Sequence, residues 1–187
     1  CKPAIPETGI ETNIELGCGL PFQVAVWKEE WLELKQLGVI LLGSTPASFD
    51  KEILEQAMRN ERRVTWTIRP EALVSMATHL FREEGFRFII ATALHTRKGF
   101  EIYYHFSFDP SGLILNLHVI LDGMQPEIES ITPLFEAANW IEREMHELFG
   151  INFLHHPNQD KLLSEGNWAE GVYPYRKEFE ATESTRK

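Results

Sequence analysis

Histidine and acidic side chains gather in the last third of the chain, where acid–base or metal chemistry has its best candidates. His146 and Glu147 are followed by His155 and His156, and Glu142 stands nearby as a possible general base. Such a set could hold a zinc ion and activate water for hydrolysis. The spacing argues against this, because a helical zinc site presents two histidines at i and i+4, and position 150 is glycine. A metal-dependent hydrolase is therefore an alternative interpretation only.

Other catalytic arrangements are weakly represented. His105 and His118 fall on the mixed face of an expected hairpin, a placement more typical of half-buried polar side chains than of a site. Cys1 and Cys18 are too few for an iron–sulfur cluster and too far apart for a metal knuckle. No glycine-rich phosphate loop follows an expected strand. We therefore expect any electron carrier to lie in partner proteins rather than in this chain.

An apolar seam predicts the helix that positions the charged cluster. Its members recur at spacings of four, three, four and three residues, as one face of a helix requires: Leu134, Ala138, Ile141, Met145 and Leu148. The glycine at position 150 suits the left-handed conformation of a helix C-cap. The pattern predicts a helix over 134–149.

The other side of this helix favours a protein–protein contact. Trp140 and Arg143 lie about one turn apart, and Glu147 follows one turn later. Tryptophan and arginine are enriched where binding energy concentrates at interfaces. An exposed Arg143–Glu147 pair would add only about 0.2–0.5 kcal/mol to helix stability. We therefore expect a helix packed on both sides, with a salt-bridged solvent face as the alternative.

The segment after the helix has the composition of an extended arm. Tyr173-Pro174-Tyr175-Arg176-Lys177 places two aromatic residues around a proline and closes with two cations. Such a segment suits the surface of a neighbouring protein. A tail packed on its own domain is the alternative. The expectation is that residues 158–187 form a partner-binding arm.

The middle of the chain predicts an α+β domain. Residues 64–68 and 86–96 have strand patterns, and a helix beginning at Pro70 runs to Glu84. Residues 100–108 and 113–121 flank a type I turn, so they form a hairpin in which paired residue numbers sum to 221. Because only one hairpin face is apolar, helices should cover one face of an antiparallel or mixed sheet. This two-layer core should span residues 61–157.

The N-terminal third is irregular. Ser48 or Asp50 can cap a helix that runs to about Asn60. We expect residues 1–60 to form an arm and a helical region. Its earlier predicted parts are an irregular stretch at 1–21, a strand at 24–26, a helix at 29–36 and a short apolar run at 39–42.

Four sequence elements follow one another in the last third: Glu142-Arg143-Glu144, Glu147-Leu148-Phe149-Gly150, His156-Pro157 and Arg176-Lys177-Glu178-Phe179. Through them, residues 138–179 resemble the thirty-kilodalton subunit of respiratory complex I, the NuoC-like family of NADH:quinone oxidoreductase subunits. Residues 167–177 are similar to the version in energy-converting nickel–iron hydrogenases and formate hydrogenlyases, which favours that branch. A fainter likeness reaches back to about Arg63.

The resemblance implies a cofactor-free assembly subunit that is not catalytic by itself. It would pack against a hydrogenase-large-subunit-like partner and an iron–sulfur small subunit, peripheral on the cytoplasmic side of a membrane, and so support electron transfer. Together with the helix and the arm, it gives these expected interface residues: Trp140, Glu142, Arg143, Glu144, Glu147, His156, Tyr173, Tyr175, Arg176 and Lys177.

Charge and hydropathy bound the remaining classes of function. Lys and Arg total 18 against 28 Asp and Glu, a net charge of −10, which gives no electrostatic support for binding nucleic acid. The sequence has no run of 18 apolar residues, so we expect no direct membrane insertion. A free-standing adaptor domain is the third interpretation. It would not co-purify with a large-subunit homologue, whereas an assembly subunit would.

Overall fold

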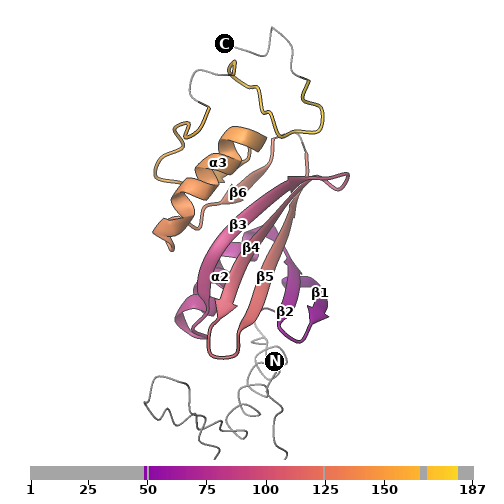
Figure 1. Cartoon of the computed structure of the whole chain (residues 1–187), viewed down its shortest axis with the longest axis vertical. Coiled ribbons are helices and arrows are strands. Elements are labelled where there is room, and N and C mark those ends of the chain that lie inside the picture. Colours follow the sequence, from indigo (N-terminus) through magenta and orange to yellow (C-terminus); the bar gives the residue numbers. More distant parts are fainter. Residues whose placement is uncertain (1–48, 50, 124, 165–167, 181–187) are drawn as a thin grey trace, which may run out of the picture.

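The computed structural model describes residues 49, 51–123, 125–164 and 168–180 (Figure 1). The predicted elements at 24–26, 29–36 and 39–42 lie outside them. No described helix has both the length and the apolar character needed to cross a membrane. In chain order the elements are β1 (Ile53–Asn60), β2 (Arg63–Ile68), η1 (Pro70–Ala72), α2 (Leu73–Arg82), β3 (Arg87–His95), β4 (Phe100–Phe108), β5 (Leu113–Leu121), β6 (Glu127–Glu129), η2 (Glu136–Ala138), α3 (Asn139–Phe149) and β7 (Asn152–Leu154).

Five of the strands form one mixed sheet in the order β1-β2-β5-β4-β3, and β6 and β7 form a small parallel pair. Within the large sheet β2 and β5 run parallel, while the other neighbours are antiparallel. The β4–β5 hairpin pairs Phe100 with Leu121 and Phe108 with Leu113, as the predicted register requires. The expected α+β fold with a mixed sheet is confirmed.

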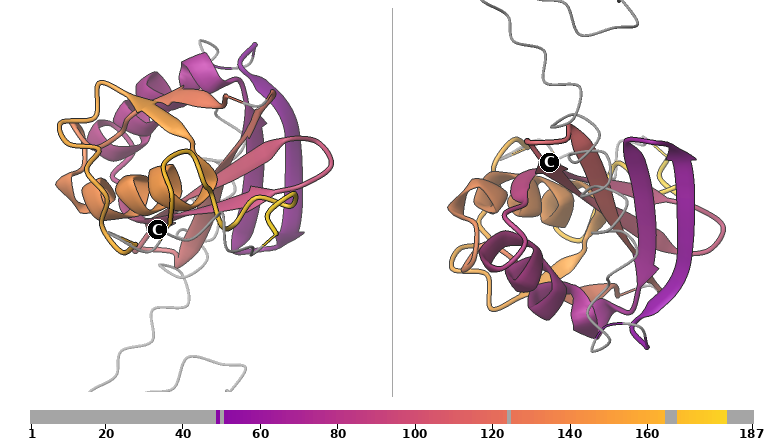
Figure 2. Two further views of the ribbon diagram at one scale, coloured as in Figure 1. Left: turned by 90° about the horizontal axis from the view of Figure 1, so that it is seen from above. Right: turned by 90° about the horizontal axis from the view of Figure 1, so that it is seen from below.

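Helices α2 and α3 lie on the same side of the sheet, as the view from above shows (Figure 2). The core fills the space between the two layers, and Ile102, Tyr104 and Phe106 from β4 are fully buried there. Leu115 and Leu117 from β5 complete the same surface. Since no described helix covers the other side, the predicted two-layer architecture is confirmed.

The expected helix after Pro70 is present, and it ends at Arg82, just before the predicted end at Glu84. Pro70 opens the short helix η1, which continues into α2. Leu73, Met76 and Leu80 bury the inner side of α2 against the sheet. Gly85 then adopts a φ of 74° before β3, a left-handed conformation that suits glycine.

The prediction of a helix from Ser48 or Asp50 to Asn60 is wrong, because Ile53–Asn60 forms the edge strand β1. The helical spacing of apolar residues here does not mark a buried face, since Leu54 is 59% exposed and most of the strand is open to solvent. Backbone pairing with β2 decides the conformation instead. The large sheet therefore begins at Ile53.

The helix expected over 134–149 begins later than predicted. Leu134 lies in a turn closed by its N–H and the carbonyl of Ile131 at 3.0 Å, and η2 precedes α3. Ala138, Met145 and Leu148 are nevertheless buried, as the apolar seam predicts. The apolar seam correctly predicts which side chains are buried, but it places the helix N-terminus too early.

Candidate functional site

Glu142 lies at the centre of a buried hydrogen-bond network. Its side chain is fully enclosed, and its carboxylate accepts hydrogen bonds from the backbone N–H of Ile131 at 2.8 Å and the hydroxyls of Thr132 at 2.7 Å and Ser130 at 2.5 Å. These donors lie in the turn after β6, so the carboxylate fastens that turn to α3. Burial, and then the charge on Glu142, raise the pKa of the Tyr104 phenol well above its usual value.

His156 encloses the same network from the chain beyond β7. Its side chain is fully buried, with Nε2 3.7 Å from Glu142 Oε2. Nδ1 accepts a hydrogen bond from the N–H of Asn158 at 3.1 Å, so Nε2 carries the hydrogen and donates to the carbonyl of Asn139 at 3.3 Å. Glu142 and His156, both expected at a partner interface, thus have their contacts inside their own chain. The reason is that sequence spacing alone cannot tell a buried carboxylate from an exposed one.

Glu147 also binds groups of its own chain. It is 5% exposed, and its carboxylate accepts backbone N–H groups from Leu162 at 2.7 Å, Leu163 at 2.9 Å and Ser164. Burial raises the pKa of the Glu147 carboxyl, but the hydrogen bonds from Ser164, Leu163 and Leu162 outweigh it, so the pKa lies below its usual value. Glu147 therefore holds residues 162–164 onto α3 rather than offering a free charge to a partner.

Arg143 holds the preceding residues in the same way. Its Nε donates to the carbonyl of Asp160 at 2.9 Å, and its terminal nitrogen donates to the carbonyl of Lys161 at 3.3 Å. Arg143 and Glu147, both expected at a partner interface, therefore each bind backbone groups of the segment that follows β7. The surface ion pair of the alternative interpretation does not describe these contacts. Sequence reasoning missed this segment because its backbone groups, which no side-chain pattern reveals, make the contacts.

Arg176 fixes the C-terminal segment against the end of α3. Its Nε donates to the carbonyl of Phe149 at 2.6 Å, where the helix dipole favours a cation. The guanidinium also lies 4.4 Å from the Tyr173 ring centroid and 5.1 Å from that of Phe100. At Tyr173 and Arg176 the C-terminal segment therefore packs on its own domain, which was the alternative interpretation. This segment crosses the end of α3 in Figure 2.

Large apolar side chains are exposed around α3, among exposed charged residues such as Glu136, Lys161 and Lys177. Trp140 is 70% exposed, and Leu163 and Tyr175 are each 60% exposed. Leu163 stands on the segment held by Glu147, and the N–H of Tyr175 donates to the carbonyl of Leu148 at 3.1 Å. Trp140, Leu163 and Tyr175 therefore form a surface along α3, called here the α3 ridge. Two other expected interface residues lie close to it, the half-buried Glu144 and the exposed Lys177.

The four side chains proposed for a hydrolase do not converge. His146 Nδ1 bonds to the carbonyl of Ile151 at 2.9 Å, whereas His155 Nδ1 lies 2.8 Å from Glu129 Oε2. Glu147 and His156 are engaged as described above. Across the described residues, no three side chains of metal-ligating type assemble into a cluster. The geometry therefore offers no support for a shared zinc site.

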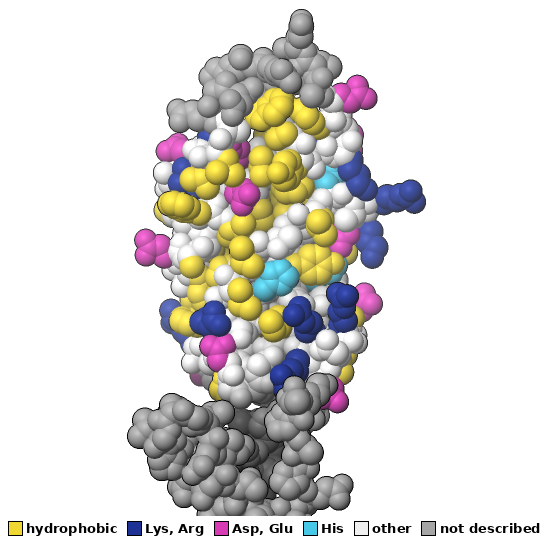
Figure 3. Space-filling view, viewed as in Figure 1, with side chains coloured by type: hydrophobic (Ala, Val, Ile, Leu, Met, Phe, Trp, Pro, Cys, Tyr) yellow, Lys and Arg dark blue, Asp and Glu magenta, His cyan; other side chains and the backbone are white. Residues whose placement is uncertain are grey.

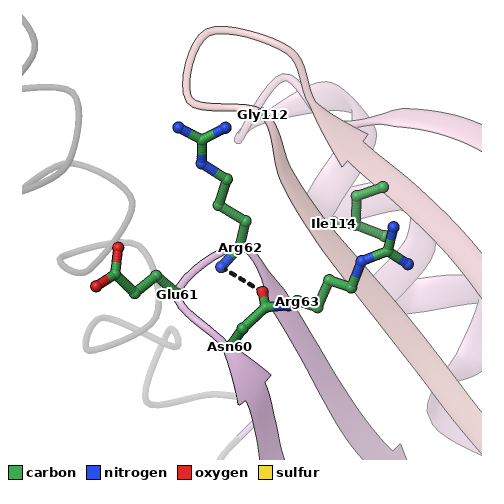
Figure 4. Close-up of a pocket in the computed structure, with 6 residues that line it drawn as sticks. All are labelled: Asn60, Glu61, Arg62, Arg63, Gly112 and Ile114. Carbon is green, nitrogen blue, oxygen red and sulfur yellow. Dashed lines mark hydrogen bonds between the residues drawn. The ribbon is translucent and has the colours of Figure 1, made fainter. Parts of the chain in front are cut away.

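A shallow hollow lies at the other end of the molecule, beside the β1–β2 turn (Figure 4). The N–H of Arg62 donates to Asn60 Oδ1 at 2.9 Å and shapes this turn. The guanidinium of Arg63 extends beside Ile114 in the close-up, while Glu61 points away from it. The hollow contains no residue that the sequence singles out for function.

Replacing Glu147 with glutamine should lower the free energy of unfolding at pH 7 by about 1–2 kcal/mol, because a charged acceptor of three N–H groups is lost. A carboxyl whose pKa is depressed by folding stabilises the folded state above its unfolded pKa, and this contribution disappears as pH falls through the folded pKa. The difference from wild type should therefore shrink below about pH 4.5. Urea unfolding at pH 7, 5 and 3 measures it, and Glu144→Gln is the control. A difference that stays constant with pH would contradict the assignment.

Known proteins resemble this chain across most of its length. The family model of the respiratory-chain NADH dehydrogenase 30 kDa subunit matches residues 66–185. NADH-ubiquinone oxidoreductase subunit 9 of Reclinomonas americana is 28% identical over 155 residues, which cover 80% of this chain and 72% of that protein. Formate hydrogenlyase subunit 5 of Escherichia coli is 25% identical over 148 residues, covering 77% of this chain but only 26% of that protein.

A solved structure shares the fold. A chain of the membrane-bound sulfane sulfur reductase, an archaeal respiratory membrane complex, superposes with a TM-score of 0.61 at 20% identity, covering 79% of this chain and 86% of that chain. The family model covers more than half of the sequence, including the four motifs on and after α3. This chain belongs to the family of the respiratory-chain NADH dehydrogenase 30 kDa subunit.

Proposed function

We propose that this chain is a cofactor-free structural subunit of a membrane-associated oxidoreductase complex and that it docks a hydrogenase-large-subunit-like partner through the α3 ridge. Its relatives are named as subunits of NADH-ubiquinone oxidoreductase and formate hydrogenlyase. Its own part would be to hold a redox partner, and an iron–sulfur small subunit beside it, in a fixed relation for electron transfer. Family membership and the exposed apolar ridge support this proposal.

The observation that carries the proposal is that hydrogen bonds hold the backbone around Leu163 and Tyr175 of the α3 ridge against α3. Arg143 and Glu147 fasten residues 160–164, and Arg176 fastens the segment around Tyr175. Aromatic and aliphatic side chains on a braced backbone lose little conformational freedom on binding, so more of their contact energy appears as affinity. The residues of the family motifs thus act through the surface that they brace.

Formate hydrogenlyase subunit 5 adds support for an intimate partner. The matched region is 26% of that protein, so a region like this chain is covalently joined there to a much longer polypeptide. A docking surface on a separate subunit would serve the same purpose as that covalent link. We place the chain as a peripheral component on the cytoplasmic side of the membrane-bound complex.

Trp140→Ala should lower recovery of the assembled complex about tenfold or more, because a central interface tryptophan commonly contributes at least about 2 kcal/mol to binding. The melting temperature of the isolated chain should change by less than about 2 °C, since the side chain is 70% exposed. Leu54→Ala is the matched control, as Leu54 is 59% exposed on β1 and away from α3. Native gel electrophoresis of affinity-purified complex measures assembly. Full assembly with the Trp140 variant would exclude the α3 ridge as a docking surface.

A further inference from the structure

The side of the sheet that no described helix covers has an unusual composition. We call it the outer face; it is formed by the outward side chains of β2, β5, β4 and β3. Away from the strand ends its outward residues are mostly threonine, isoleucine, tyrosine, asparagine and histidine, and Glu101 is the single carboxylate among them. A sheet face turned to water is normally rich in charged side chains, whereas interface centres are depleted in them.

One hydrogen-bonded chain crosses four strands of the outer face. His105 Nδ1 lies 2.7 Å from Asn116 Oδ1, and Asn116 Nδ2 donates to Thr65 Oγ1 at 3.1 Å. Thr92 Oγ1 lies 3.3 Å from His105 Nε2 on the other side. Strands β3, β4, β5 and β2 each contribute one member, so these polar groups are satisfied by one another.

A second network surrounds a buried acid–base pair. His118 Nε2 lies 2.8 Å from Glu101 Oε2, and the two residues are only 7% and 8% exposed. Thr96 donates to Glu101 at 2.6 Å, Tyr103 donates to it at 3.3 Å, and Thr67 Oγ1 lies 3.0 Å from His118 Nδ1. The Tyr103 ring stacks on His118 with centroids 4.2 Å apart. Burial raises the pKa of the Glu101 carboxyl, but hydrogen bonds from Thr96, His118 and Tyr103 and the attraction of His118 together bring it below its usual value.

These networks lower the cost of covering the outer face. Removing water from an unpaired polar group is costly, whereas a group already hydrogen-bonded within the protein loses little when a partner covers it. Beside the networks, Ile90 and Leu94 are each 47% exposed on the same side of β3. The outer face therefore offers apolar contact area next to polar groups that need no water.

The ends of the strands supply charge. Arg63 lies at one end, and Arg97 and Lys98 lie in the β3–β4 turn at the other. None of the three forms an ion pair with another described residue, although the whole chain has a net charge of −10. Figure 3 views the molecule from this side and shows a band of hydrophobic side chains beside histidine, with Lys and Arg gathered at the lower end and on the right.

We propose that the outer face docks a second protein subunit of the same complex, distinct from the partner at the α3 ridge. Its contact surface would be apolar at the centre and would carry carboxylates that meet Arg63 at one end and Arg97 and Lys98 at the other. The proposal rests on the proposed function, because it requires the chain to work inside an assembly, and it makes the subunit a bridge between two partners.

Ile90→Glu tests the outer face in the assembled complex, because Ile90 is 47% exposed and lies opposite His105 rather than opposite Glu101. A new charge at an exposed position should leave the melting temperature of the free chain within about 2 °C of wild type. It should lower recovery of the second partner about tenfold or more, while the α3-ridge partner stays bound. Met58→Glu is the matched control, because Met58 is 58% exposed on β1 opposite Val64, which faces the helical side of the sheet. Equal recovery from the Ile90 and Met58 variants would overturn the proposal.

A photoreactive benzophenone amino acid at position 92 or 140, in the purified complex, identifies what covers each surface. Thr92 is exposed on the outer face, and Trp140 is on the α3 ridge. The expected result is one partner polypeptide cross-linked from position 140 and a different one from position 92. If position 140 cross-links and position 92 links to nothing, to a second copy of this chain or to its own residues 1–48, the second docking surface is rejected while the proposed function stands. If position 140 gives no cross-link to another subunit, the proposed function itself fails.

Discussion

Replacing Glu142 with alanine is expected to lower the free energy of unfolding by about 3–5 kcal/mol. The carboxylate is fully buried and accepts hydrogen bonds from Ser130, Ile131 and Thr132. Removing it leaves three buried donors without an acceptor, and each unsatisfied group costs roughly 1–3 kcal/mol. The loss should be measured by urea denaturation of the isolated chain, followed by circular dichroism.

Two further variants separate this effect from the general loss of a glutamate on α3. Glu144→Ala removes a half-buried acid two residues away and should change stability by less than about 1 kcal/mol. Glu142→Gln keeps one acceptor oxygen for the turn at 130–132 and should be intermediate. If the alanine variants at positions 142 and 144 are equally stable, the network does not hold the turn.

This prediction changes the meaning of the family motif. A Glu-Arg-Glu triplet on a helix that also carries an exposed tryptophan suggests that all its charges face a partner. The structure divides the triplet instead, because Glu142 faces the core, Arg143 binds backbone carbonyls at 160–161, and Glu144 is half-buried. The motif therefore describes how the segments after α3 are held on the domain, and its contribution to the proposed docking would be indirect.

The elements that sequence reasoning predicted well are those decided by local pattern. The β4–β5 register followed from alternation and a type I turn, and the observed pairs run from Phe100–Leu121 to Phe108–Leu113. The end of α3 followed from a single glycine. In both cases the deciding contacts lie close in sequence, or the side-chain period fixes them.

The elements that were missed depend on distant partners. Strand β1 has no buried face of its own to reveal, and its conformation follows from pairing with β2. The burial of Glu147 depends on backbone N–H groups of residues 162–164, which any sequence would supply. The spacing of charges could identify important residues, but only the three-dimensional path of residues 158–164 and 168–180 shows which way they face.

Replacing Gly150 with alanine is expected to lower the free energy of unfolding by about 1–4 kcal/mol and to release the segment around Tyr173 and Arg176. About 1–2 kcal/mol comes from placing a Cβ on a backbone with a φ of 72°. A further contribution of up to about 2 kcal/mol comes from Arg176, because the new Cβ would lie 2.6 Å from its terminal nitrogen and from the Tyr173 ring. The guanidinium would have to leave the end of α3.

Gly85→Ala supplies the control for the backbone contribution. Its φ of 74° is nearly the same, and a Cβ there would meet nothing within 4 Å. The Gly150 variant should therefore be less stable than the Gly85 variant by the amount due to Arg176 and Tyr173, and trypsin should cleave it faster after Lys177. Equal destabilisation with unchanged cleavage would mean that the segment is not held by Arg176, and the proposed docking through a braced α3 ridge would lose its support.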